Sequence, residues 1–225
     1  MDFFEAFPAP SPPRRPARPP VRPWTRPDTV VPGSVAAEAV VACTDAVAVA
    51  VGSLRAYANG FEFTVHVRQR ATDDDGFREP LDPLGRHPRV RGAAEPGRVL
   101  RLGIAYADGR RAAAIGHWTP ADPEGDSDLV LEQRGSSGSE YRWDGEFWVH
   151  PLPPEGPVTF VVSWLAQDVV EERAEVDGAA IRAAATRAVD LWPGGPAAVA
   201  SAPLVPIKLP VPWPDLDGSP TLRTS

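Results

Sequence analysis

The pair Asn59-Gly60 lies between two stretches of alternating side chains, and this arrangement constrains the fold more than any other part of the sequence. Valine alternates with alanine over 47–51, and apolar residues alternate with polar ones over 61–68. Asn-Gly readily adopts the positive φ angles of a tight two-residue turn, and alternation is typical of strands with one buried face. The sequence therefore predicts a β-hairpin that turns at 59–60.

A second hairpin follows from the same rule. Leu100, Leu102 and Ile104 lead to Asp108-Gly109, after which the chain returns through 112–118. Further candidate strands are 128–134, 139–150 and 157–165, whereas 71–97 and 135–139 have the composition of loops. Seven or eight short strands predict a mainly β fold, an antiparallel two-sheet sandwich of immunoglobulin-like or related type. Cys43 is the only cysteine, so the cysteine pair of antibody domains is missing and the topology stays open.

Pro-rich segments flank this β region. Residues 8–32 contain ten prolines and five arginines, a composition that favours extended chain, so we expect 1–32 to form a disordered or extended arm. The domain itself is expected over 33–192. It includes one helix near 178–191, capped by Asp177 and ended by Trp192-Pro193-Gly194-Gly195. Residues 193–225 contain eight prolines and are expected to form an extended tail.

Several of these motifs resemble a family of actinobacterial β-sandwich-like proteins. They are Gly60-Phe-Glu-Phe63, Trp164 at the end of a strand, Asp177-Gly178 with the alanine-rich helix, and Leu191-Trp-Pro193. The motifs are structural and span about 35–193. The family has no assigned activity, so the resemblance implies a fold and carries over no functional residue.

Aromatic residues supply the candidate partner-binding sites. Phe3, Phe4 and Phe7 form a cluster ahead of the Pro-rich arm, as a short docking peptide would. Tyr141, Trp143 and Trp148 lie in one strand or in a hairpin that turns at Asp144-Gly145. Tryptophan and tyrosine are enriched at binding hot spots, so these rings are candidates for a partner-binding platform. The alternatives are that the rings fill the core and that the N-terminus contacts nothing or folds back on the body.

The sequence offers no catalytic motif. Gly135-Ser-Ser-Gly-Ser139 does not match a nucleophile elbow, and Cys43 lies in a Val/Ala run that predicts a buried, inert thiol. Glu62, His66 and His117 form only a weak metal-binding constellation, and the acidic stretches 73–76 and 122–128 depart from the calcium-loop pattern. A P-loop needs a lysine within the motif Gly-x-x-x-x-Gly-Lys-Ser/Thr. Lys208 is the only lysine of the sequence and does not lie in such a motif. We expect no metal and no cofactor.

Charge and hydropathy limit the partners. The net charge is −7, and because residues 1–28 carry five arginines and three acids (+2), the remainder carries −9. An acidic body repels nucleic acid, so we do not expect DNA or RNA binding. There is no long apolar run and no recognisable secretory signal, and with a single cysteine we expect a cytoplasmic protein away from membranes.

These observations favour a non-catalytic protein-interaction or accessory module, such as a subunit of a larger assembly. The alternatives are a hydrolase with a site assembled across strands and a sandwich that binds a carbohydrate or small ligand. An enzyme requires a concave pocket with converging titratable groups, and a sugar site requires exposed coplanar aromatics. A partner-binding module requires an apolar surface patch or a docked tail.

Overall fold

Twelve strands, one α-helix and a short 3-10 helix make up the described part of the chain in a computed structural model. The structure describes residues 22–71, 81–85, 97–115 and 129–193. The elements are β1 (Val30–Val31), β2 (Gly33–Ser34), β3 (Ala39–Cys43), β4 (Val47–Tyr57), β5 (Gly60–Gln69), β6 (Arg101–Tyr106), β7 (Arg111–Ile115), β8 (Val130–Gly138), β9 (Arg142–His150), β10 (Pro157–Trp164), η2 (Leu165–Gln167), β11 (Val169–Asp177), α1 (Gly178–Ala185) and β12 (Val189–Asp190).

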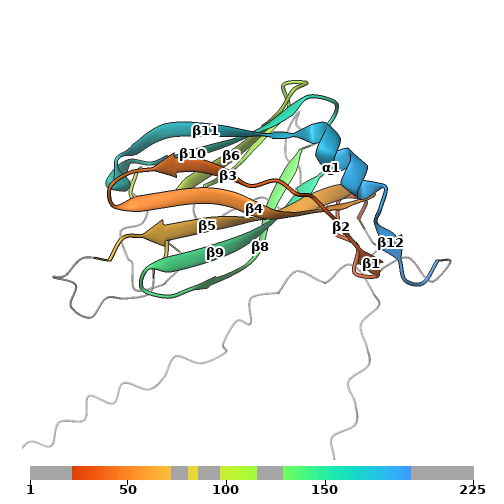
Figure 1. Ribbon diagram of the computed structural model, residues 1–225, viewed down its shortest axis with the longest axis horizontal. Helices are drawn as coiled ribbons and strands as arrows, with labels where there is room; N and C mark the ends of the chain where they lie inside the picture. Colours follow the sequence, from red (N-terminus) through yellow and green to blue (C-terminus); the bar gives the residue numbers. More distant parts are fainter. Residues whose placement is uncertain (1–21, 72–80, 86–96, 116–128, 194–225) are drawn as a thin grey trace, which may run out of the picture.

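Successive hairpins alternate between two antiparallel sheets. The six-stranded sheet has the order β2-β4-β5-β9-β8, with β3 also paired to β4, and the four-stranded sheet has the order β11-β10-β6-β7. The hairpins β4–β5 and β8–β9 lie in the first sheet, and β6–β7 and β10–β11 lie in the second. Figure 1 shows the two sheets as layers, with α1 at one end near β1 and β12. The prediction of a mainly β fold with antiparallel sheets is confirmed.

Alternation along the strands produces one core between the layers. The core-facing residues of β5 are Phe61, Phe63, Val65 and Val67, and those of β10 include Val158, Phe160 and Val162. The ring of Phe63 stacks on Phe147 of β9 at 5.5 Å and meets Phe160 of the other sheet edge-on at 4.9 Å. The hairpins predicted at 59–60 and 108–109 are confirmed, because β4 pairs with β5 and β6 with β7 around these turns.

The loop predicted at 135–139 proved wrong for 135–138, and of the two alternatives left open for Asp144-Gly145 the structure has the single strand. Residues 135–138 belong to β8, and Asp144-Gly145 lies in the middle of β9. Gly145 is needed there because the indole of Trp143 lies over it: a Cβ at 145 would be 2.1 Å from Trp143 Cη2. Gly145, which suggested a turn, instead leaves room for the indole of Trp143 in the core.

The C-terminal elements also differ from the prediction. Asp177 caps α1 as expected, accepting a hydrogen bond from the amide of Ala179 at 2.8 Å, but the helix ends at Ala185 instead of Leu191. Val189–Asp190 pairs with Val30–Val31 as a separate two-stranded sheet, which takes these residues out of the helix. Strand β11 was not predicted, because five of its nine residues are charged and only two of the nine, Val169 and Val176, are buried.

Within the described residues, no helix is long and apolar enough to cross a membrane.

Candidate functional site

The outward face of the six-stranded sheet carries a polar row along β5 and β9. The paired positions are Glu62 with Trp148, Thr64 with Glu146, His66 with Asp144 and Arg68 with Arg142. Because strand side chains alternate, these residues lie opposite to the core-facing aromatics of the same two strands. One end of the row is covered by the chain's own N-terminal segment, and the other end is open.

Residues 22–28 cover the Trp148 end of the row. The indole Nε1 of Trp148 donates to the carbonyl oxygen of Trp24 at 2.7 Å. The side-chain amide of Asn59 donates to the carbonyl oxygens of Pro23 at 3.0 Å and Thr25 at 2.9 Å. Trp148 is 0% exposed although it lies outside the core between the sheets. The covering segment therefore accounts for its burial.

A buried carboxylate holds the same segment through charge. Glu62, 5% exposed, accepts from Arg26 Nη1 at 2.7 Å and from the Tyr57 hydroxyl at 3.0 Å, and it pairs with Arg55 Nε at 2.8 Å. Burial and the Glu62 charge raise the pKa of Tyr57 to about 12. Burial alone would lower the pKa of Arg26, but the bond and charge of Glu62 outweigh it and raise that pKa. We call the contacts of 22–28 with Asn59, Glu62 and Trp148, together with the bond from Tyr57 to Glu62, the arm clamp.

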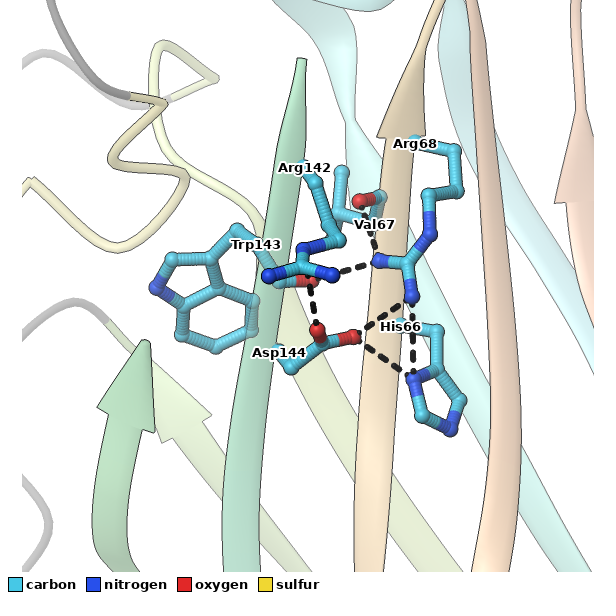
Figure 2. A network of polar contacts seen from close by, with 6 residues as sticks. All are labelled: His66, Val67, Arg68, Arg142, Trp143 and Asp144. Atoms are coloured by element: carbon cyan, nitrogen blue, oxygen red, sulfur yellow. Dashed lines mark hydrogen bonds and ion pairs between the residues drawn. The ribbon is translucent and has the colours of Figure 1, made fainter. Parts of the chain in front are cut away.

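At the open end, Asp144 gathers three cationic or ionisable side chains, as Figure 2 shows. Its Oδ1 lies 2.7 Å from His66 Nδ1 and 2.8 Å from Arg68 Nη2, and its Oδ2 lies 3.6 Å from Arg142 Nε. Partial burial raises the pKa of Asp144, but the bonds from His66 and Arg68 outweigh this and hold that pKa below its usual value. We call these four residues the Asp144 cluster.

The chemistry of the Asp144 cluster is that of an ion-pair network. A carboxylate at His66 Nδ1 orients the imidazole, as in acid–base dyads, but here two guanidinium groups share the same carboxylate. The carboxylate charge is therefore divided among three partners. Arg68 and Arg142 keep 45% and 59% of their side chains exposed, which leaves donors available at the surface.

The structure separates the predicted partner-binding residues. Phe3, Phe4 and Phe7 lie outside the described residues. Tyr141 is half-buried beside the turn between β8 and β9, whereas Trp143 is 4% exposed within the core and Trp148 is under the arm clamp. Figure 2 shows the Trp143 indole pointing away from the Asp144 cluster. A role for these two indoles in partner binding stays a prediction.

Other candidates are also placed. Glu62 and His66 lie on the same face but bind different partners, and His117 lies outside the described residues, as do 73–76 and 122–128. Cys43 is exposed, so the expectation of a buried thiol is wrong. It ends β3, which pairs with β4, and its side chain faces outward there.

Sequence reasoning missed the arm clamp. Its signal was present only in part: Glu62 is an acid in an aromatic strand, and Arg22-Pro-Trp-Thr-Arg26 carries two arginines. Local pattern does not show that segments 36 residues apart form an ion pair. The clamp depends on tertiary placement of the arm over β5 and β9.

No family model, curated protein or solved structure matches this chain.

Proposed function

We propose that the protein is a non-catalytic protein-interaction module whose partner-binding element is its clamped N-terminal arm. The observation that carries the proposal is the seating of 22–28 on the outward face of the six-stranded sheet, where it buries Trp148 and Glu62. A docked tail is one of the two features that distinguish a partner-binding module from an enzyme or a sugar site.

The contacts of the clamp hold a Pro-containing turn, because the amide of Thr25 donates to the carbonyl oxygen of Arg22 at 3.0 Å. Backbone carbonyls of Pro23, Trp24 and Thr25 accept from an indole and an amide, and the arginine side chain meets a buried carboxylate. Proline at the second position of a turn restricts the unbound chain, so the segment loses little entropy when the body holds it. The body thus binds its own arm as it would a peptide ligand.

The clamp fixes the position of residue 22, to which residues 1–21 are joined. We propose that Phe3, Phe4 and Phe7 contact a protein partner and that Tyr141 and the open Asp144 cluster, on the same sheet, supply a second contact area. Trp143 supports this sheet from the core, and Trp148 acts by holding the arm. In a larger assembly, the arm would tie this subunit to its neighbour. The cytoplasm is the proposed location.

The strand connections support an immunoglobulin-like sandwich as the scaffold. Lettered from β4, the six-stranded sheet contains the order A-B-E-D and the four-stranded sheet the order G-F-C-C′. These are the strand orders of immunoglobulin domains, in which hairpins alternate between the two sheets. We propose this class for the fold.

A capture experiment tests the function. Full-length protein, a form lacking 1–21, and Glu62→Gln are immobilised and exposed to extract from the cells that produce the protein. We expect one partner, identified by mass spectrometry, to be retained by the full chain, lost without 1–21 and weakened by Glu62→Gln. Trp164→Phe is the control. Trp164, like Trp148, donates an indole hydrogen bond to a backbone carbonyl, that of Arg98 at 3.0 Å, but it lies away from the arm. Equal retention by all forms, or none by the full chain, contradicts the proposal.

A further inference from the structure

The outward face of the four-stranded sheet is a broad hollow of about 810 Å³. Its floor is made of small or short side chains, Gly103, Ala105, Ala113, Thr159 and Ser163, with Val161 at the centre. Leu165 and Val170, which also line the hollow, are 53% and 72% exposed. Apolar side chains gathered at the surface in this way are typical of interfaces.

The register of the sheet arranges this face in rows that run across the four strands. One row reads Arg111, Ala105, Thr159 and Glu175 from β7 to β11. The next row reads Ala113, Gly103, Val161 and Arg173. Each row therefore has unlike ends, and the first has a cation at one edge and an anion at the other.

From this pattern we propose that the face binds a second copy of the chain. A two-fold axis parallel to the strands, between β6 and β10, places β7 of one copy over β11 of the other. In the first row, Arg111 then faces Glu175 of the second copy, and in the next row Gly103 faces Val161. An isologous interface must be self-complementary, and both pairings are: opposite charges meet at the edge, and the smallest residue meets a branched side chain at the centre.

Gly103 supports the close approach. A glycine inside a strand is less stable than alanine would be. The monomer does not require it, because its φ is not positive and a Cβ would meet Val161 Cβ at 3.5 Å, an ordinary contact. Glycines in strands occur at bulges, at bends or where another backbone comes near, and the pairing register around Gly103 is regular, which favours the close approach.

Sedimentation velocity on the full chain tests the dimer. We expect a concentration-dependent dimer for the natural sequence. Arg111→Glu and Glu175→Arg each place two like-charged pairs in the interface and weaken self-association at least about tenfold, since each 1.4 kcal/mol of repulsion is tenfold in Kd. Both residues are exposed, so neither change disturbs the core.

Mixing the two variants is the decisive experiment. A heterodimer of Arg111→Glu with Glu175→Arg contains two opposite-charge pairs, so the equimolar mixture should dimerise like the natural chain. Glu146→Arg, on the other sheet's outward face, is the control and should leave dimerisation unchanged. A monomeric natural chain, or variants whose mixture stays as weak as each alone, overturns the proposal. Because the arm clamp lies on the other sheet, failure here leaves the proposed function standing.

Discussion

The indole nitrogen of Trp148 and the carbonyl oxygen of Trp24, 124 residues apart in sequence, form a 2.7 Å hydrogen bond. This bond lies on the outward face of a sheet, where a tryptophan would ordinarily meet water. Here the ring also contacts Tyr57 edge-on at 5.4 Å and leaves no room for a side chain at Gly60, where a Cβ would lie 2.7 Å from it. Tyr57 and Gly60 of the body therefore pack closely against the Trp148 ring that bonds to the arm.

Alkaline pH should loosen the arm clamp. Tyr57 has a pKa of about 12 in the folded protein against 10.0 ordinarily. Between these values the folded state binds the proton more tightly than the unfolded state, so stability is fully present below pH 10 and is lost as pH rises toward 12. The limit for one group is about 1.4 kcal/mol per pH unit. Denaturant unfolding at a series of pH values measures the slope.

Tyr57→Phe should make that slope shallower. Burial raises the pKa of Tyr106 as well, so Tyr106→Phe is the matched variant that removes the other contribution and leaves the clamp intact. An alkaline slope unchanged by Tyr57→Phe would show that burial and Glu62 do not raise the pKa of this phenol.

Acid should weaken the Asp144 cluster. The pKa of Asp144 is lowered by folding, so its contribution is present above the ordinary value of 3.8 and is lost as pH falls through the lower folded value. Asp144→Asn should reduce stability at pH 7 by about 1 kcal/mol, the usual worth of partly exposed charged contacts. It should also flatten the acid limb of the stability profile. Glu146→Gln, two residues along β9, should leave that limb unchanged; equal flattening by both would contradict the assignment.

How much the sequence predicts depends on whether a signal is local. Asn59-Gly60 and the alternation around it predict β4 and β5, and Asp177 predicts where α1 begins, because turns and caps act over a few residues. Helix α1 ends early because Val189 pairs with Val31, and Gly145 lies in a strand, where it leaves room for the Trp143 indole. The end of α1 depends on a partner that only the folded chain brings near, as does the ion pair between Arg26 and Glu62, and the strand at Gly145 depends on its pairing with Val65 of β5.

Two strand glycines should respond to alanine with opposite sign. Gly145→Ala forces the Trp143 indole to move and should destabilise the fold by about 1–3 kcal/mol. Gly103→Ala meets only ordinary contacts and should stabilise the monomer by about 0.5–1 kcal/mol. Thermal or denaturant unfolding at low protein concentration measures both. The same loss at both positions would contradict the different surroundings of the two glycines.

The indole N–H resonance of Trp148 tests the docked arm most directly. In a ¹H–¹⁵N spectrum of the full chain, Trp148→Phe identifies the resonance by its disappearance. We predict that this proton exchanges slowly with water, because it is buried and bonded to Trp24, and that Arg26→Ala accelerates its exchange by releasing the arm from Glu62. The Trp164 indole should be unaffected. A Trp148 proton that exchanges rapidly in the natural chain, or one indifferent to Arg26→Ala, would contradict the arm clamp and the function built on it.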